Sequence, residues 1–487
     1  MVDRASECIH PNAKLKLMQA GAIPPYFDFR REVSRMFRLA VPVALAELGW
    51  MSMTIVDTIM VGHLGPAAIG ATGIGSSAYY SFAIFGMGLL LGLDTLVSQS
   101  YGAGDREDCH HSLAQAVYLA LLMTPLLMTL FAFMPPVFNA FGVNEQVSVL
   151  AGPYLTTLSW STLPLLLYGA FRRYLQGVGH VRPVMFVLLS SNLVNWFGNW
   201  LLIDGHWGLP ALGVPGSAMS TCFARLYMAA TLAMFIWWLE RGTEPALASL
   251  KRQPDVKRIK LLLRIGFPAA TQILLEIGAF GAAAVLAGRL TPAALAAHQI
   301  ALNCAALSYM VPLGISSAAA VAVGQAIGRR EPVSARRDGF IAIGLGCAFM
   351  LCSAVTFVAA PGPILRVYTD DARVLTIGTG LLAIAALFQL FDGIQTVATG
   401  ALRGLGNTRT PMLVNLGGYW LFGLPIGYLL CFQGKLGIYG LWIGLSVALV
   451  AIALVLMYSW QRNSRALLTA TAASAMTFPP APPALTP

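Results

Sequence analysis

The chain has 487 residues, of which 57% are hydrophobic and only 11% are charged, and its formal net charge is +10. So few charged residues exclude a water-soluble globular domain of this size. The 7 cysteines are scattered and form no CxxC motif, so they predict neither a disulfide framework nor a metal site. Several apolar runs exceed the roughly 18 residues that a helix needs to cross a bilayer, which predicts an integral membrane protein.

Hydropathy along the chain predicts an all-α membrane protein with about twelve transmembrane helices. The apolar runs cover residues 38–62, 68–101, 112–134, 147–171, 182–203, 213–240, 260–287, 294–327, 338–360, 373–401, 411–433 and 437–461. A polar stretch at residues 243–255 divides these runs into two equal sets. The expected segments are a cytoplasmic N-terminal tail (1–36), an N-lobe (37–240), a cytoplasmic linker (241–259), a C-lobe (260–461) and a C-terminal tail (462–487). The C-terminal tail is rich in Ala, Pro and Thr, a composition that predicts disorder.

The positions of the lysines and arginines predict the orientation in the membrane. The chain has 31 of these residues, and nearly all lie on the cytoplasmic side if the N-terminus is cytoplasmic. The exceptions on the outer side are Arg289, Arg366, Arg373 and Lys435. The positive-inside rule therefore predicts that both termini are cytoplasmic. This asymmetry explains the basic net charge without a nucleic-acid-binding patch.

An internal repeat relates the two predicted lobes. The segment FRLAVP at 37–42 corresponds to LRIGFP at 263–268, and GHLGPAAIGA at 62–71 corresponds to GRLTPAALAA at 288–297. Both pairs keep an offset of about 226 residues, as expected of a repeat. Each lobe has an even number of spans, so both insert in the same sense, as parallel repeats around a central cavity. This arrangement is typical of a transporter, and a rigid helical bundle is the alternative.

Two carboxylates in the predicted C-lobe break the repeat. Glu276 aligns with Trp50, and Asp392 aligns with Leu165, so the shared fold does not require either acid. A carboxylate inside a membrane span costs roughly 3 kcal/mol or more and usually has a function. The two acids therefore indicate a polar site rather than packing.

Amides and hydroxyls accompany these acids in the sequence. Gln272 lies one turn before Glu276, and Gln389 lies nearly one turn before Asp392. The predicted coupling-cation site comprises Glu276, Asp392, Gln299, Asn303 and Tyr309. Oxygen ligands from several helices suit Na+, whereas two neighbouring carboxylates removed from water also suit a proton. A network of hydrogen bonds between helices is the alternative for the amides.

The predicted N-lobe has acids of its own. Asp57 lies near the outer end of the first span, and Asn195 and Asn199, spaced i,i+4, are its candidate partners. The alternative is an Asp57 that water solvates at the membrane surface. Glu47, nearly three turns earlier, is either a second proton-relay carboxylate or a water-facing side chain. The candidates for the lining of a substrate cavity are Gln272, Gln389 and Glu47.

Other polar residues in the spans carry less specific signals. Asp94, at the inner end of the second span, is interpreted as a structural hydrogen-bonding residue. Arg225 is the one basic residue deep in a predicted span, and it needs a partner or a path to water. The EDCHH segment at residues 107–111 lacks the ligand spacing of a metal site. The sequence has no Walker A motif and no convergent catalytic set, so an enzyme is not expected.

Several segments resemble the multidrug and toxic compound extrusion (MATE) family. They are VDTIMVGHLG (Val56–Gly65), LDTLVSQSYGAG (Leu93–Gly104), AAHQIALN (Ala296–Asn303), MVPLGISSAAAV (Met310–Val321) and LRGLGNTRTP (Leu402–Pro411). With the repeat, the resemblance covers roughly residues 37–461, and the set of acids is similar to that of the bacterial NorM-type branch. Two positions depart from the family pattern, since Ala322 stands where an arginine is common and Glu47 replaces a more usual glutamine.

The resemblance implies a secondary antiporter whose two lobes give alternating access to a central cavity. It implies export of amphipathic, mostly cationic organic compounds in exchange for Na+ or H+ at the bacterial inner membrane. In the family, the acids at Glu276 and Asp392 bind the coupling cation, with Na+ as the candidate metal. Asp57, Asn195 and Asn199 match a second, proton-linked polar site. The expected partners are drugs and the lipid bilayer, with no nucleic acid, no cofactor beyond the coupling ion, and a monomer sufficient to build the site.

A flippase for a lipid-linked saccharide, from the same superfamily, is the alternative function. Such a substrate is anionic, so its cavity should be rich in arginine and lysine. Arg225 is the one such residue that the sequence places deep in a span. This shortage of buried cations weighs against the flippase.

Overall fold

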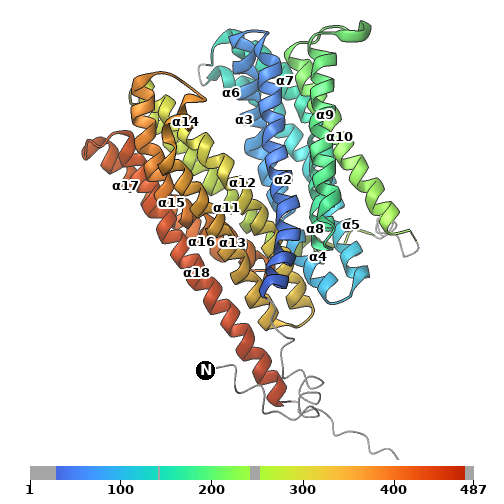
Figure 1. Cartoon of the computed structure of the whole chain (residues 1–487). Coiled ribbons are helices and arrows are strands. Elements are labelled where there is room, and N and C mark those ends of the chain that lie inside the picture. The colour runs from blue at the N-terminus through green and yellow to red at the C-terminus, as the bar shows by residue number, and fades with distance from the viewer. Residues whose placement is uncertain (1–28, 141–142, 242–252, 478–487) are drawn as a thin grey trace, which may run out of the picture.

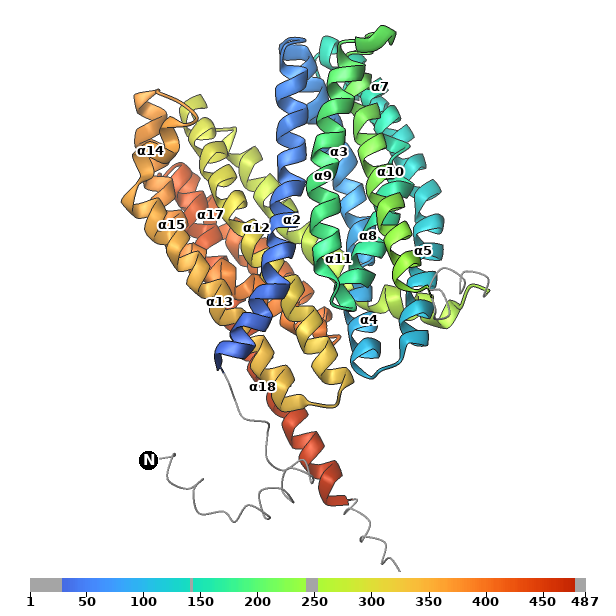
Figure 2. The same cartoon turned by 45° about the vertical axis from the view of Figure 1, so that its right-hand side comes forward.

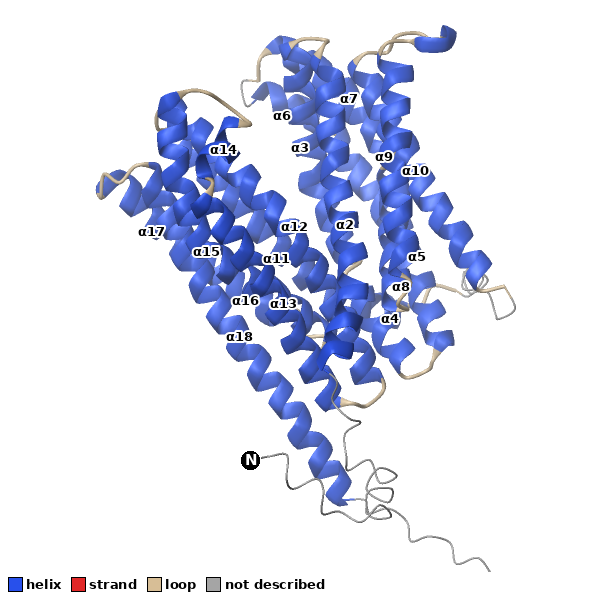
Figure 3. Cartoon of the chain, in the orientation of Figure 1, coloured by secondary structure: helices blue, strands red, loops and turns tan. Residues whose placement is uncertain are grey.

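The computed structural model describes residues 29–140, 143–241 and 253–477. Within these ranges the regular elements are helices and no strand is present, which confirms the predicted all-α fold (Figure 3). The first half forms α2 (Phe29–Gly62), α3 (Pro66–Leu89), α4 (Gly92–Gly102), α5 (Arg106–Ala132), α6 (Met134–Ala140), α7 (Glu145–Ser159), α8 (Thr162–Gly177), α9 (Val181–Ile203), η1 (His206–Gly208) and α10 (Val214–Leu239). The second half forms α11 (Val256–Ala287), α12 (Pro292–Gly328), α13 (Pro332–Ala359), α14 (Pro361–Arg366), α15 (Ala372–Gly404), α16 (Arg409–Asn415), η3 (Leu416–Gly423), α17 (Leu424–Tyr428), η4 (Leu429–Gln433) and α18 (Ile438–Thr477).

Among the described residues, 11 helical stretches are long and apolar enough to cross a membrane. The predicted span at 147–171 differs, because it falls on the two shorter helices α7 and α8. The helices part at Trp160 and Ser161, where the Ser161 and Thr162 hydroxyls each donate to a backbone carbonyl nearly one turn back at 2.6 Å. Such side-chain bonds compete with the helical pattern, and hydropathy does not detect them.

The helices form two bundles that lean toward each other at one end (Figures 1 and 2). One bundle contains α3 to α10, and the other contains α12 to α18. The bundles separate toward the end that carries α6 and α14, and they meet where the last turns of α4 and α12 come together. The meeting end is called the closed end.

Close approach between α4 and α12 seals the closed end. A Cβ atom on Gly102 would lie 2.1 Å from the Gln325 carbonyl oxygen, and one on Gly328 would lie 2.0 Å from the Gln99 carbonyl oxygen. Only glycine lets the two backbones approach so closely. The Gln99 side-chain amide also donates to the Gly404 carbonyl at 2.9 Å. The two halves of the chain are therefore in backbone contact at this end.

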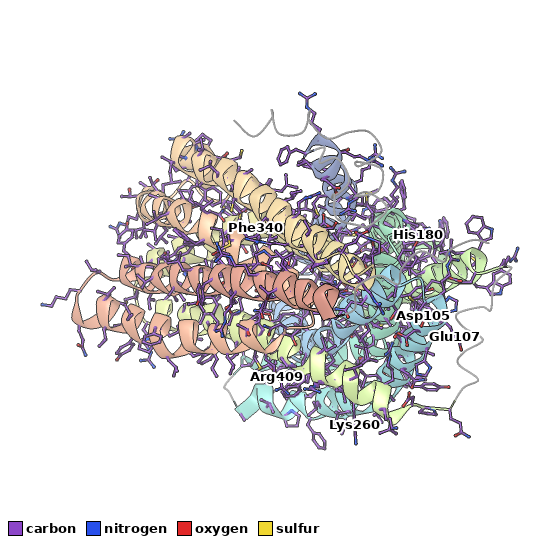
Figure 4. The ribbon with its side chains drawn as sticks, turned by 90° about the horizontal axis from the view of Figure 1, so that it is seen from below. Asp105, Glu107, His180, Lys260, Phe340 and Arg409 are labelled. Carbon is purple, nitrogen blue, oxygen red and sulfur yellow. The ribbon has the colours of Figure 1, made fainter. Side chains whose placement is uncertain are left out.

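Charged residues lie at the closed end. Seen from below, it carries charged residues from both halves, among them Asp105, Lys260 and Arg409 (Figure 4). The basic loops that predicted the cytoplasmic side lie here. Under the positive-inside rule, the closed end is the end expected to face the cytoplasm.

The helices α2 and α11, which the repeat relates to each other, connect the two cores. Met36 and Ala40 of α2 pack in the core of the C-terminal half. Leu262 and Ala270 of α11 pack in the core of the N-terminal half. Each half thus packs against the N-terminal part of the first helix of the other half, and α11 forms part of the boundary between the bundles.

The helices at the two ends of the chain are longer than expected. α2 begins at Phe29, before the first predicted span, and α18 continues to Thr477. The predicted disorder of the C-terminal tail is therefore wrong for residues 462–477. Hydropathy detects the apolar part of a helix, whereas these polar ends contain residues of good helix propensity such as Arg, Leu and Ala. Residues 1–28, 242–252 and 478–487, which include most of the predicted tails and linker, lie outside the described ranges.

Candidate functional site

A cavity of about 570 Å³ lies between α2, α3, α7, α10 and α11. The hydroxyl-bearing residues that line it are Thr54, Thr58, Thr72, Ser76, Ser77, Tyr80, Ser81, Tyr154 and Thr221. The charged residues that line it are Asp57 and Arg225, and α11 contributes Leu274, Ile277 and Gly281. The cavity therefore has a polar wall from the N-terminal half and an apolar wall from α11. Its volume is that of a pocket for a drug-sized molecule.

The structure brings Asp57 together with its predicted partners. The Asn195 and Asn199 amides both donate to Asp57 Oδ1 at 2.6 Å, and Thr221 donates to Oδ2 at 3.2 Å. Both asparagines are fully buried on α9, and Ser220 of α10 donates to the Asn195 carbonyl at 2.7 Å. Three neutral donors hold the carboxylate at the cavity wall. This arrangement differs from the alternative of an Asp57 solvated at the membrane surface.

Arg225 has neutral partners. Its guanidinium donates to Ser161 Oγ at 2.6 Å and to the Tyr80 hydroxyl at 2.9 Å, and Cζ lies 4.8 Å from the centre of the Tyr79 ring. The residue is only 1% exposed. No carboxylate among the described residues forms an ion pair with it. The sequence could not identify these partners, because hydroxyls and rings on other helices carry no charge signal.

In the C-terminal half, Gln395 lies between Glu276 and Tyr419, a residue that was not among the predicted site residues. Gln395 Nε2 lies 3.1 Å from Glu276 Oε1 and 3.0 Å from the Tyr419 hydroxyl. Tyr419 is fully buried and lies on η3, which is a π-helix. A π-helical turn is often found at a functional site. The signal available in the sequence was a lone tyrosine within an apolar run.

Asp392 lies nearly one turn before Gln395 on α15 and is buried, with 8% exposure. Among the described residues, no side chain forms a hydrogen bond or ion pair with it. The predicted ligands on α12 are exposed or half-buried, and within the described part of the chain none of them is hydrogen-bonded to either acid. They are Gln299, Asn303 and Tyr309. The described residues also contain no group of three or more His, Cys, Asp and Glu side chains that could hold a metal ion.

The residues predicted to line a substrate cavity do not line this cavity. Glu47 is buried and forms an ion pair with Arg172 of α8, so it does not face water. Gln389 is fully buried and donates to two serines at 2.7 and 3.0 Å. Gln272 is buried one turn before Glu276. The sequence located these polar residues on helices, but their surroundings depend on which helices become neighbours.

Asp94 of α4 joins the two halves at the closed end. Its Oδ2 lies 3.3 Å from Arg173 Nη1 and 3.1 Å from Arg403 Nε. The first contact is a hydrogen bond, whereas the second is an ion pair without hydrogen-bond geometry. These contacts agree with the structural role expected for Asp94. Arg172 and Arg403 are also buried, near the last turns of α8 and α15.

Comparisons with known proteins add a family to this geometry. The MatE family profile matches residues 42–201 and 268–429. A protein of Burkholderia mallei named "Probable multidrug resistance protein NorM" is 37% identical over 455 residues, which are 92% of this chain and 96% of that protein. A protein of Mesorhizobium japonicum with the same name is 33% identical over 458 residues, which are 93% of this chain and 98% of that protein.

Solved structures share the fold at lower sequence identity. A structure described as "eukaryotic MATE transporter AtDTX14" superimposes with a TM-score of 0.79 at 22% identity, covering 90% of this chain and 98% of that one. A structure described as the outward-facing conformation of a multidrug resistance MATE family transporter gives a TM-score of 0.81 at 18% identity, covering 90% and 97%. The two profile matches fall on the two halves that the internal repeat defined, and the relatives cover nearly the whole chain. This chain therefore belongs to the MatE family.

Proposed function

We propose that the chain is a secondary multidrug efflux transporter of the bacterial inner membrane, with both termini in the cytoplasm. It exports amphipathic, mostly cationic organic compounds in exchange for Na+ or H+. The names of its relatives support the multidrug function. Asp57, a carboxylate held by neutral donors at the wall of the hydroxyl-lined cavity, supports the preference for cations.

The observation that carries this proposal is the position of α11 between the two acidic sites. Leu274 and Ile277 face the cavity that contains Asp57. Glu276, on the same helix, faces α15 and binds Gln395. A movement of α11 that accompanies ion binding on one side therefore changes the wall of the substrate cavity on the other.

In this proposal, Asp57 is the charge that attracts the organic cation. A carboxylate in a cavity with few charges attracts a cation more strongly than it would in water. A proton on Asp57 removes that attraction, so that the proton and the organic cation compete for one group. Asn195 and Asn199 hold the carboxylate in the same orientation for either ligand.

The coupling cation binds at Glu276 and Asp392, with amide and hydroxyl oxygens as its remaining ligands. It acts by binding one state of the transporter better than the other, because a ligand shifts an equilibrium only by its difference in affinity. The closed end then opens and the cavity becomes accessible from the other side. Organic cation leaves while the coupling ion enters.

The test uses the purified protein in liposomes, with a fluorescent organic cation as the transported compound and with Na+ and H+ gradients imposed separately. We expect one of the gradients to drive movement, and Asp392→Asn to lower its rate at least about tenfold because the coupling ion loses a charged ligand. Asp370→Asn is the matched control, since Asp370 lies exposed between α14 and α15.

Two outcomes would contradict the proposal. If both Asp392→Asn and Glu276→Gln transport the organic cation at the wild-type rate, the coupling ion does not bind in the C-terminal half. Movement under neither gradient would contradict coupled antiport, and the same vesicles would then test the flipping of a lipid-linked saccharide. The structure gives that alternative little support. Arg225 lines the cavity, but the buried Arg172 and Arg403 contact acids and do not line it.

A further inference from the structure

The unexplained charge in the cavity is Arg225. Its side chain is 1% exposed, and its partners Ser161 and Tyr80 are neutral. Its Nε is buried without a hydrogen-bond partner. A cation at membrane depth normally pairs with an acid or reaches water. Here it lines the cavity, so a ligand in the cavity can contact it.

We propose that Arg225 is an anion-binding subsite, so that the cavity accepts compounds with a carboxylate group in addition to their cationic group. The inference rests on the proposed function and specifies a substrate class for the same cavity. Guanidinium suits this role because its planar fork matches both oxygens of a carboxylate. Lysine would offer only a point charge.

Asp57 and Arg225 are arranged as two separate poles. Thr221, which donates to Asp57 Oδ2 at 3.2 Å, precedes Arg225 by one turn of α10. One turn corresponds to a rise of about 5.4 Å, so the poles are close. They nevertheless form no ion pair, because Asp57 is bound by amides and a hydroxyl, and Arg225 by hydroxyls and rings. A zwitterionic ligand can therefore contact both charges without first breaking a salt bridge.

The tyrosines around Arg225 explain how the protein tolerates this buried charge. The guanidinium carbon lies 4.8 Å from the Tyr79 ring centre and 5.6 Å from the Tyr80 ring centre. Cation–π contacts of this kind stabilise a cation by only about 0.5–2 kcal/mol. They fix the orientation of the guanidinium without neutralising it. The site is thus formed before the ligand arrives, which lowers the entropic cost of binding.

The experiment compares two dyes that differ in one group: a rhodamine with a free carboxylate and its ethyl ester, which is purely cationic. Binding to the purified full-length protein is measured by fluorescence polarisation. Arg225→Gln should weaken binding of the acid more than binding of the ester, so that the ratio of their affinities falls at least about tenfold. Asp57→Asn should weaken the binding of both dyes, and Asp370→Asn should leave the binding of both dyes unchanged.

The outcomes separate this inference from the proposed function. If Arg225→Gln lowers the affinity for both dyes equally, or lowers neither affinity, Arg225 has a structural role and the inference is overturned. If the wild-type protein binds the ester dye but does not bind the acid dye, the inference is also overturned, whereas the proposed function stays in place. Binding of neither dye would overturn both. If Arg225→Gln does not fold, Arg225→Lys is tested instead. Lysine lacks the forked guanidinium group, so the ratio of the affinities for the acid and the ester should still fall about threefold. An unchanged ratio would contradict the anion-binding subsite.

Discussion

Asp57 is held by Asn195, Asn199 and Thr221, which are all neutral donors. Neutral donors affect the carboxylate differently from an arginine, which would neutralise its charge. They orient the carboxylate and satisfy its lone pairs, yet they leave the negative charge available to a ligand. The carboxylates at Glu47 and Asp94, which face arginines, do not have this property. Of these three acids, Asp57 is therefore the one suited to bind an exchangeable cation.

Replacing Asp57 by asparagine tests this distinction. The side chain keeps its size but loses its charge, and its new amide group would face the donors of Asn195 and Asn199. We expect the affinity for a fluorescent organic cation to fall at least about tenfold, since a charge-assisted contact contributes about 1.5–3 kcal/mol. Equilibrium binding to the purified protein measures this, and Asp370→Asn serves as the control. Unchanged affinity would exclude Asp57 as the cation-binding group.

Tyr419 is expected to position the acid of the C-terminal half. Its hydroxyl binds Gln395, which in turn binds Glu276. Tyr419→Phe keeps the buried ring but frees Gln395 to rotate, so the concentration of coupling ion needed for half-maximal transport should rise about threefold to tenfold. Tyr458→Phe is the control, because Tyr458 is 64% exposed. Equal effects of the two substitutions on ion dependence would contradict a positioning role.

The sequence predicted the Asp57 partners but not those of Glu47 or Arg225, and the reason is geometric. An acid within a span and two asparagines spaced i,i+4 are visible without knowledge of helix packing. The pairing of Glu47 with Arg172 depends on α2 lying against α8 at one depth. The contact of Arg225 with Ser161 depends on the break between α7 and α8. Neither arrangement leaves a pattern in a single stretch of sequence.

At the scale of elements, the approach of α4 to α12 depends on glycines. A Cβ atom on Gly328 would lie 2.0 Å from the Gln99 carbonyl oxygen and 2.7 Å from the Ala103 nitrogen. Both are backbone atoms and cannot move without the helix. Gly328→Ala should therefore prevent the closed end from sealing and lower gradient-driven efflux at least about tenfold, because a packed interface tolerates such overpacking poorly. Efflux of an organic cation from proteoliposomes measures this.

Gly344→Ala provides the matched control for that prediction. Gly344 is also helical, on α13, and a Cβ atom there would meet no atom within 4 Å. We expect wild-type efflux from this variant. Wild-type efflux from Gly328→Ala as well would mean that α4 and α12 need not come into backbone contact during transport.

Hydropathy predicted the membrane-spanning elements well and their ends less well. Most predicted spans coincide with a described helix, because burial in lipid requires an apolar helix of a certain length. Two of the differences are the break between α7 and α8 and the extension of α18 to Thr477. Both depend on polar residues, through hydroxyl bonds to the backbone in one case and helix propensity in the other. A scale that measures transfer to lipid does not contain either effect.

At the scale of the whole molecule, a cluster of charged side chains joins the two bundles at the closed end. Asp94 and Arg173 of the N-terminal half meet Arg403 of the C-terminal half at the closed end. Thr95 also donates to the Arg403 carbonyl at 2.5 Å. In the proposed transport cycle, alternating access requires this end to open, so that the charge cluster separates in each cycle. Its strength therefore helps to set the equilibrium between the two states.

Arg403→Gln should shift that equilibrium toward a state in which the closed end is open. The substitution removes one of the two cations that face Asp94 and leaves the other in the same half, so the acid no longer attracts the C-terminal half. A spin-label pair at Ala103 and Arg329 can report the change, because both residues are exposed at the closed end. The 7 native cysteines are first replaced by serine. Double electron–electron resonance on the protein in nanodiscs then gives the distribution of distances between the labels.

We expect the wild-type background to give a short distance and Arg403→Gln to add a longer one, with the populations shifting at least about fivefold, as for a coupling free energy of about 1 kcal/mol or more. Arg409→Gln is the control, because Arg409 is an exposed arginine near the same end and makes no ion pair within the described part of the chain. A long-distance population in both variants would indicate a general effect of net charge. A single short distance in Arg403→Gln would mean that the backbone contacts of α4 and α12 hold the closed end without the charge cluster, and the cluster would then be a packing feature rather than a lock.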